Sequence, residues 1–458
     1  PTLVKITAAT LRAPVGWQVA SAPAGAHAPG PIPEIADRVA AFVVTVAPDQ
    51  PPTQPYWLRA PRQGQLNPWP ADAPRGSAFD DPLAAAVVGL EIGGAAVTLA
   101  QPLQYRVIDP VRGELRRNLE IVPAVTLALD SPFEIVPLDM RGKPRRVSVV
   151  LQNNSQSAVN GVLKLDLPRA WTVSPSESPF NIQRKGDRVT LVCSVTTPKD
   201  AEPGRYPLRA VAVTSSRAYD LSMRTVSYPH IQTHRMYTPA SEQFCVLDLK
   251  VAPVKVGYIM GTGDQVPEAL RRMGLDVTLL GEEALGSGDL GRFDTIVVGI
   301  NASSARPDFT AASARINDYV RNGGTLLVQY QHPDYVQKKL PPFPAQMASR
   351  VTDETAEVKM LVPGHPAFTT PNRITARDFS DWVQERNLYA FTTFDPRYTA
   401  LLESHDPGEP AQLGGEVYVR LGKGQYVYTA YAWFRQLPAG IPGAYRLFAN
   451  LVSLGARK

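Results

Sequence analysis

Cysteine, long apolar runs and charge of one sign are all scarce in this sequence, and each shortage excludes a class of protein. Only 2 of 458 residues are cysteine, too few for a disulfide-stapled scaffold. No apolar run approaches the ~20 residues that a membrane-spanning helix requires. The net charge is only +5 and charged residues make up 19%. The densest basic run, Arg141 to Arg146, is typical of a solvated hairpin loop, so nucleic acid is not the expected partner.

The apolar content is high enough for several packed cores. Hydrophobic residues make up 44% of the chain, which excludes charge-driven disorder, and ~150 residues per domain predicts three domains. Cys193 alternates with Leu191 and Val195 along an expected strand, so we expect a small buried core residue. The sequence leaves open whether Cys193 pairs with Cys245.

The first 253 residues predict β-sandwich structure. Short alternating runs such as Phe42–Val46 and Val147–Leu151 are separated by Pro, Gly, Asn and Asp turns. Two stretches recur at nearly the same offset, which indicates two related sandwiches. Pro14–Val19 echoes Pro168–Val173, and Val44–Ala60 echoes Val195–Ala210. The expected division is a β-sandwich over 1–128, an Ig-like β-sandwich over 129–230 and a connector strand over 231–253.

The repeat also predicts that the first sandwich is incomplete. In the second copy a strand at 147–152 precedes the recurring Pro-x-x-Trp stretch, and its counterpart in the first copy would fall before Pro1. A sandwich without that edge partner exposes unpaired backbone groups. We therefore expect the first sandwich to be truncated and the natural protein to continue upstream.

From Val254 the pattern changes to alternating strands and helices, which predicts a mostly parallel sheet with helices on both faces. The region 254–458 resembles the α/β domain of class I glutamine amidotransferases, in which a strand leads into a sharp turn that presents a nucleophilic cysteine. Here the strand Thr325–Tyr330 leads into Gln331 and His332. The resemblance therefore implies a degenerate domain, and we expect neither catalysis nor a cofactor in this chain.

Two short motifs are candidate binding sites at strand ends. The turn Gly261-Thr262-Gly263-Asp264 offers backbone amides to an anion, but a tight turn with Asp264 as helix N-cap is the favoured interpretation. The third glycine of the dinucleotide fingerprint is absent. His332 opens a His-Pro-Asp sequence similar to the zinc motif of sugar deacetylases, but Tyr335 replaces the second Asp and the other histidines are scattered. We therefore expect no metal site.

The segment Asp378 to Arg386 mixes Trp382 and Arg386 with acids and amides. Such a mixture either lines a polar pocket or caps the sheet. Arg435 follows an apolar-aromatic strand, and a buried arginine there requires a carboxylate, which Asp378 or Glu385 would supply.

Tryptophans in the β half have two interpretations. They fill the space between sheets, or they stack on sugars. If the sandwiches bind carbohydrate, the expected stacking platforms are Trp57, Trp69 and Tyr56.

Several stretches resemble a known family, the C-terminal region of large bacterial PIG-L/LmbE-type deacetylase proteins. They are Arg112–Pro123, Lys255–Asp264, Arg373–Tyr389 and Phe434–Gly455. The segment 145–215 also resembles the Ig-like domain associated with alpha-galactosidases. The catalytic zinc domain of that family has no counterpart here, so none of its catalytic residues is carried over.

The resemblance implies a non-catalytic accessory region of an exported N-acetylglucosaminyl deacetylase-like protein, extracellular or periplasmic. Its partners would be carbohydrate, another protein or an upstream deacetylase domain. One alternative is a hydrolase with an unrecognised site in the α/β domain, near Gly263, Gln331, His332 and Trp382. Another is a structural or assembly protein of the cell exterior, whose edge strands pair with other chains.

Overall fold

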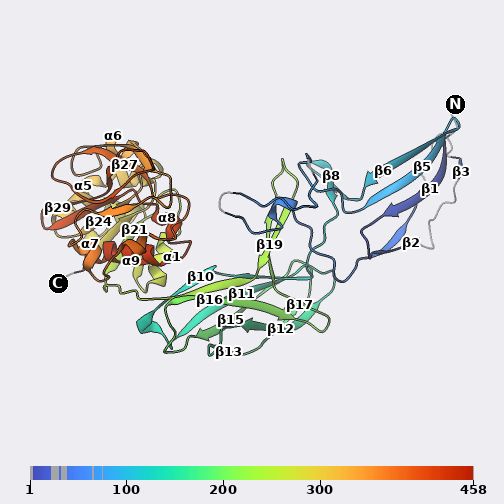
Figure 1. Ribbon diagram of the computed structural model, residues 1–458, viewed down its shortest axis with the longest axis horizontal. Coiled ribbons are helices and arrows are strands. Elements are labelled where there is room, and N and C mark those ends of the chain that lie inside the picture. Colours follow the sequence, from blue (N-terminus) through green and yellow to red (C-terminus); the bar gives the residue numbers. More distant parts are fainter. Residues whose placement is uncertain (1–3, 22–29, 32–38, 64–65, 75, 457–458) are drawn as a thin grey trace.

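A computed structural model describes residues 4–21, 30–31, 39–63, 66–74 and 76–456. The chain is mostly β and has several sheets. The N-terminal strands lie at one end, a two-sheet body in the middle and the helix-containing body at the other end (Figure 1).

The N-terminal part contains one four-stranded sheet and two ribbons. The sheet has the order β3-β1-β5-β6. Its strands are β1 (Val4–Arg12), β3 (Gly30–Pro31), β5 (Ala85–Ile92) and β6 (Ala95–Pro102). The ribbons are β2 (Gln18–Ser21) with β4 (Phe42–Thr45), and β7 (Gln104–Asp109) with β8 (Gly113–Asn118). A 3-10 turn, η1, spans Tyr56–Leu58.

The predicted first sandwich, 1–128, does not form a packed pair of sheets in the part of the chain that the structure describes. Among the described residues of 4–124, the buried hydrophobic side chains are Tyr56, Ala73, Ala84 and Ala85. Alternation predicts a strand but not a partner layer, and the Ala and Thr side chains of β1 and β6 bury little apolar area. The strands of this region therefore form without a shared hydrophobic core among the described residues.

The second predicted sandwich is a true two-sheet body. One sheet has the order β10-β20-β16-β12-β14, with β17 paired to β16, and the other has the order β13-β15-β11-β9. Its strands are β9 (Val125–Leu129), β10 (Phe133–Pro137), β11 (Pro144–Asn153), β12 (Val159–Asp166), β13 (Thr172–Ser174), β14 (Ser178–Ile182), β15 (Arg188–Thr196), β16 (Gly204–Val213), β17 (Ala218–Tyr219) and β20 (Ser241–Leu247). A 3-10 turn, η2 (Leu138–Met140), follows β10.

The core of this sandwich confirms the interpretation of its tryptophan and cysteine. Trp171 is buried, with ring centroids 5.2 Å from both Tyr206 and Phe244. Cys193 belongs to the same core, whereas Cys245 faces the core of the helix-containing body, and both thiols are free. Cys193 and Cys245 therefore form no disulfide with each other.

The segment assigned as a connector contributes to the sandwich. Strand β20 pairs in parallel with β10 and antiparallel with β16. Only the hairpin of β18 (Leu221–Val226) and β19 (His234–Pro239) lies outside both sheets. The sequence of β20 did not indicate its partner strands, because pairing across ~100 residues depends on the fold and not on the local pattern.

The C-terminal body is built on a ten-stranded mixed sheet. Parallel strands run in the order β22 (Asp276–Leu279), β21 (Lys255–Ile259), β23 (Thr295–Val298), β24 (Thr325–Gln329) and β30 (Gly424–Thr429). The antiparallel strands are β25 (Ala345–Val351), β26 (Val358–Met360), β27 (Asn387–Phe394), β28 (Thr399–Ser404) and β29 (Gln412–Leu421). The sheet is therefore mixed and not mostly parallel, because the chain returns in hairpins after residue 345.

Helices cover both faces of this sheet, as predicted. They are α1 (Val266–Arg272), α2 (Glu282–Gly286), α3 (Ala302–Ala305), α4 (Pro307–Ala311), α5 (Ser313–Arg321), α6 (Asp334–Gln337), α7 (Pro366–Thr369), α8 (Trp433–Gln436) and α9 (Pro442–Ser453). The 3-10 turns are η3 (Leu290–Arg292) and η4 (Ala376–Phe379). One core lies under α1 and α9 and the other under α5. In the described ranges no helix is long and apolar enough to span a bilayer.

Candidate functional site

Ligands of open α/β sheets bind beyond the carboxyl ends of the parallel strands. Here those ends lead into Asn301 after β23, Gln331 and His332 after β24, and Phe434 after β30. A ligand-binding or catalytic site is therefore expected at this edge.

Gln331 occupies the turn that follows β24, and its side chain is fully engaged. The residue is 0% exposed. Its Nε2 donates to the carbonyl oxygens of Gly299 (2.8 Å) and Gln329 (2.9 Å), while its Oε1 accepts from the Ser303 amide (3.0 Å). Gln331 thus ties the ends of β23 and β24 together and offers no free group to a substrate.

His332 is half-buried and lacks a catalytic partner. Its Nε2 lies 3.0 Å from the Tyr330 hydroxyl, and its ring packs edge-on against Tyr389 at 5.3 Å. The contacts that the structure gives His332 include no carboxylate. An imidazole held by a phenol at the surface is not the acid–base pair that hydrolysis requires.

The turn at Gly263 and Asp264 is closed by its own carboxylate. Asp264 accepts hydrogen bonds from the Tyr258 hydroxyl (2.7 Å) and from the amides of Val266 (3.0 Å) and Ile300 (3.4 Å). Burial raises the pKa of Asp264, and these hydrogen bonds counteract part of the rise. The Asp264 carboxylate therefore takes up the amides of Val266 and Ile300, and the Thr262 amide donates to the Ile300 carbonyl oxygen at 3.0 Å. The N-cap of α1 is Gln265, one residue later than predicted.

Trp382 and Arg386 lie in the interior and do not line a pocket. Trp382 is 4% exposed and packs against Trp433 at 5.2 Å. Arg386 is also 4% exposed, lies 5.3 Å from the Trp382 ring, and donates to the carbonyl oxygens of Ala356 and Phe379. Burial lowers the pKa of Arg386. Of the two interpretations, the burial of both side chains favours the cap on the sheet.

Arg435 has the carboxylate partner that its position required. Its Nε donates to Glu385 at 2.5 Å, whereas Asp378 pairs with Arg446 at 2.8 Å. The predicted alternatives are thus resolved in favour of Glu385.

Sequence analysis missed an aromatic stack at this edge. The Tyr330 ring lies 5.7 Å from both Tyr389 and Phe434, at an interplanar angle of 21° in each pair. Tyr389 and Asn301 adopt left-handed backbone conformations, with φ of 55° and 53°, which are uncommon for residues other than glycine. The only signal in the sequence was the position of Tyr330 and Phe434 just past strand ends.

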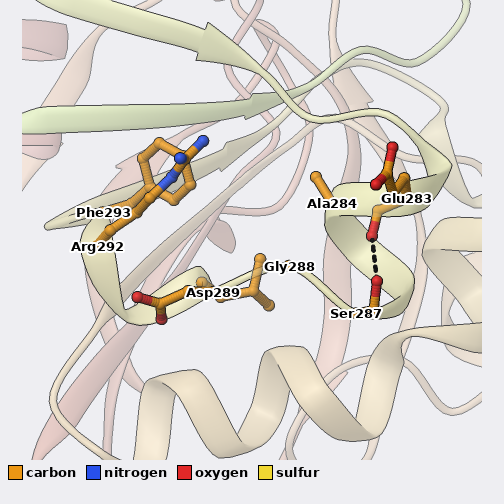
Figure 2. A pocket seen from close by; sticks show the side chains of 8 residues that line it. Glu283, Ala284, Ser287, Gly288, Asp289, Arg292 and Phe293 are labelled. Carbon is orange, nitrogen blue, oxygen red and sulfur yellow. Dashed lines mark hydrogen bonds between the residues drawn. The ribbon is translucent and has the colours of Figure 1, made fainter.

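Hollows also lie at the opposite edge of the sheet. Figure 2 shows one of about 240 Å³, where Arg292 and Phe293 face Glu283 and Ser287. Ser287 donates to the Glu283 carbonyl oxygen at 3.3 Å, and the Arg292 guanidinium lies 4.7 Å from the Phe293 ring. These residues precede β23, so the hollow is near the amino ends of the parallel strands. It has no arrangement of groups that would support a reaction.

The predicted stacking residues of the β half do come together. Tyr56 is the exception among the expected platforms, because it is 4% exposed and lies beneath the others. Its ring centroid is 4.9 Å from Trp57 and 4.8 Å from Trp69, and its hydroxyl donates to the Ser77 carbonyl oxygen. Trp69 is 57% exposed and Trp57 is half-buried. Tyr56 thus supports a surface made by the two tryptophans.

Two further aromatic rings, which sequence analysis missed, extend this surface. Phe79 is 47% exposed and stacks on His234 at 5.8 Å and 14°. His234 also lies 6.1 Å from Trp57, so hairpin β18–β19 contributes to the same surface. We call Trp57, Trp69, Phe79 and His234 the aromatic surface. Trp57, Trp69 and Phe79 come from one stretch of the chain, whereas His234 lies far from them in sequence, so spacing gave no signal that it joins them.

A charged cluster borders the aromatic surface. Arg59 pairs with Asp72 at 3.1 Å and also contacts Asp80, and Asp80 accepts from the Tyr56 amide at 2.9 Å. Planar carboxylate and guanidinium groups next to exposed rings can hydrogen-bond hydroxyl groups while the rings cover an apolar face. Across the described ranges, no group of three His, Cys, Asp or Glu side chains is arranged to hold a metal.

Comparison with known families places one part of the chain. Residues 140–215 match the NPCBM-associated NEW3 domain of alpha-galactosidase, a stretch that contains strands β11 to β16. This match confirms the resemblance expected for 145–215. A search of curated proteins found no match, and the PIG-L/LmbE resemblance stays a prediction.

Three solved structures are similar to parts of the chain. A beta-galactosidase from Rahnella sp. R3 is 15% identical, with 44% of this chain and 31% of that chain covered and a TM-score of 0.29. An exo-beta-1,4-mannosidase from Opitutaceae bacterium strain TAV5 is 13% identical (45% and 36% covered, TM-score 0.26). Native alpha-2-macroglobulin from Escherichia coli is 14% identical (29% and 18% covered, TM-score 0.19). The chain thus spans only 18% to 36% of their lengths.

Proposed function

We propose that this chain is a non-catalytic accessory region of a carbohydrate-active protein and that it binds sugar through the aromatic surface. The observation that carries this proposal is the exposure of Trp69 and Phe79, 57% and 47%, beside a charged cluster. The match of 140–215 to a domain associated with alpha-galactosidase supports the carbohydrate setting.

The chemistry of the aromatic surface fits a pyranose ring. Exposed tryptophan and phenylalanine present flat apolar faces at low entropic cost, and such rings are typical of recognition surfaces. Arg59, Asp72 and Asp80 supply donors and acceptors at the border. A sugar that stacks on Trp69 would place its hydroxyl groups against this cluster.

The C-terminal body would then serve as a scaffold. We interpret it as a degenerate amidotransferase-like domain, because buried Gln331 stands where the nucleophile would be. If the PIG-L/LmbE resemblance holds, the enzyme that this region accompanies is an N-acetylglucosaminyl deacetylase outside the cytoplasm.

The alternative, a hydrolase site near His332, has less support. Gln331, Trp382 and Arg386 are buried and hydrogen-bonded, and Asp264 closes the Gly263 turn. The second alternative, assembly through edge strands, is compatible with carbohydrate binding.

A glycan array with the whole chain tests the proposal. We expect binding to at least one class of polysaccharide, and Trp69→Ala should weaken it about tenfold or more, as expected for a central aromatic contact. Tyr105→Ala is the matched control, because Tyr105 is 64% exposed on β7 and lies outside the aromatic surface. Loss of signal in both variants, or in neither, would contradict the assignment.

A further inference from the structure

Strand β6 is an exposed edge with none of the usual protection. It ends the sheet order β3-β1-β5-β6, and within the described part of the chain its strand partner is β5 alone. Its eight residues, Ala-Ala-Val-Thr-Leu-Ala-Gln-Pro, carry no charge. Proteins normally block such edges with charged residues, internal prolines or bulges. An uncharged, regular edge strand of this length is a template for pairing with another strand.

The ladder of the β5–β6 hairpin shows which backbone groups face outward. Ile92 pairs with Ala95 across a two-residue turn, Gly93-Gly94, in which both residues have positive φ (57° and 84°). Because an antiparallel ladder bonds alternate residues, the odd-numbered residues of β6 bond to β5. The N–H and C=O groups of Ala96, Thr98 and Ala100 are therefore left at the outer edge.

The side chains of β6 are equally unpartnered. Every residue from Ala95 to Gln101 is exposed, including Leu99 at 54% and Val97 at 36%. A sheet normally buries one face against another layer. Among the residues of this sheet whose burial the structure describes, Ala85 alone is buried, so an added strand would bring apolar contact that the sheet lacks.

We propose that β6 pairs antiparallel with the β6 strand of a second copy of this chain. A two-fold axis at Thr98 aligns Ala96 with Ala100 and Val97 with Leu99. The outward amides and carbonyls of Ala96, Thr98 and Ala100 then bond to their copies, while Val97 and Leu99 meet as a close aliphatic pair. The strand is self-complementary because it has no charge to repel its copy. This pairing joins two four-stranded sheets into one and goes beyond the proposed function.

The pairing has one consequence that rests on the proposed function. A dimer would carry two aromatic surfaces, and a polymeric glycan could contact both. The dimer would then bind a long glycan more tightly than a single chain does, because both aromatic surfaces contact the same molecule.

Sedimentation velocity of the whole chain across a wide concentration range tests the pairing. We expect a reversible monomer–dimer equilibrium, and Thr98→Lys should weaken it at least about tenfold, because two like charges then meet at the axis. The matched control is Thr10→Lys, which places the same charge on the exposed surface of β1, away from the β6 edge. Circular dichroism melting curves should show all variants folded.

A charge-swap mixture gives the sharper result. Thr98→Glu alone should also fail to dimerise, whereas an equimolar mixture of Thr98→Lys and Thr98→Glu should associate again. A monomeric mass at all concentrations would overturn the proposal, as would a dimer unaffected by Thr98→Lys. Neither outcome changes the expected effect of Trp69→Ala on glycan binding, so the two proposals fail separately.

Discussion

At the residue scale, Gln331 shows how one buried side chain ties two strand ends together. Its amide satisfies two carbonyl oxygens and one amide nitrogen that are buried at the ends of β23 and β24. Gln331→Ala should leave these groups unpaired and lower the free energy of unfolding by about 2–4 kcal/mol. Exposed Gln337→Ala is the control, with a change within about 0.5 kcal/mol. Urea denaturation measures both, and equal stabilities would contradict the structural role.

Glu416 makes a second prediction at this scale, a dependence of stability on pH. It is 0% exposed on β29. Burial raises its pKa from 4.5 to about 8, and the nearby Thr429 hydroxyl lowers the pKa only in part. The folded state therefore holds this proton more tightly than the unfolded state does. The contribution to stability is complete below pH 4.5 and is lost as pH rises to about 8.

Glu416→Gln should remove that part of the pH dependence, because the amide is neutral at every pH. We expect the variant to gain stability over the natural protein as pH increases from 5 to 8. Burial also raises the pKa of Glu242 to about 8. Both proteins should therefore keep a smaller dependence of stability on pH. Glu409 is exposed, so Glu409→Gln should leave the dependence of stability on pH unchanged. Thermal melts across this pH range measure the slopes; parallel curves for Glu416→Gln and the natural protein would rule out the buried neutral carboxyl.

At the element scale, β10 and β20 join the sandwich to the C-terminal body. Their outer faces place Phe133, Ile135, Cys245 and Leu247 in one core with α9. The Phe133 ring lies 6.2 Å from Tyr445 and has the Arg272 guanidinium 4.9 Å above it. The two bodies therefore share a continuous hydrophobic core.

Phe133→Ala should weaken this junction. We expect a loss of about 3–5 kcal/mol, typical of a large cavity in a core, and earlier proteolytic cleavage between the sandwich and the C-terminal body. Phe79→Ala, at an exposed phenylalanine, should have little effect on stability. If Phe133→Ala and Phe79→Ala unfold at the same denaturant concentration, the two bodies do not depend on this contact.

The elements differ in how well the sequence predicted them. The strand expected over Thr325–Tyr330 is β24 at Thr325–Gln329, and the strand expected over Phe42–Val46 is β4 at Phe42–Thr45, because local periodicity specifies both. The partners of β20 and the open N-terminal sheet were not predictable, since pairing and layer closure depend on contacts distant in sequence. At the site, the pairing of Arg435 with Glu385 was predicted from the need of a buried cation for an acid, although the Arg435 side chain is 36% exposed and only Glu385 is buried. The stack of Tyr330 with Tyr389 and Phe434 had no such signal.

At the scale of the whole molecule, we propose that the chain combines a sugar-binding surface with a scaffold. The aromatic surface lies in the N-terminal part and on hairpin β18–β19. The turn after β24, where the amidotransferase resemblance leads one to expect a nucleophile, is occupied by a hydrogen-bonded glutamine. Binding without turnover is therefore the central claim.

One incubation tests that claim most directly. The whole chain is mixed with the polysaccharide that it binds best on the array, and bound sugar, new reducing ends and released acetate are measured together. We predict saturable binding, weakened by Trp69→Ala, with the glycan recovered chemically intact. Cleavage or deacetylation by the purified chain would contradict the account, and so would the absence of any glycan binding.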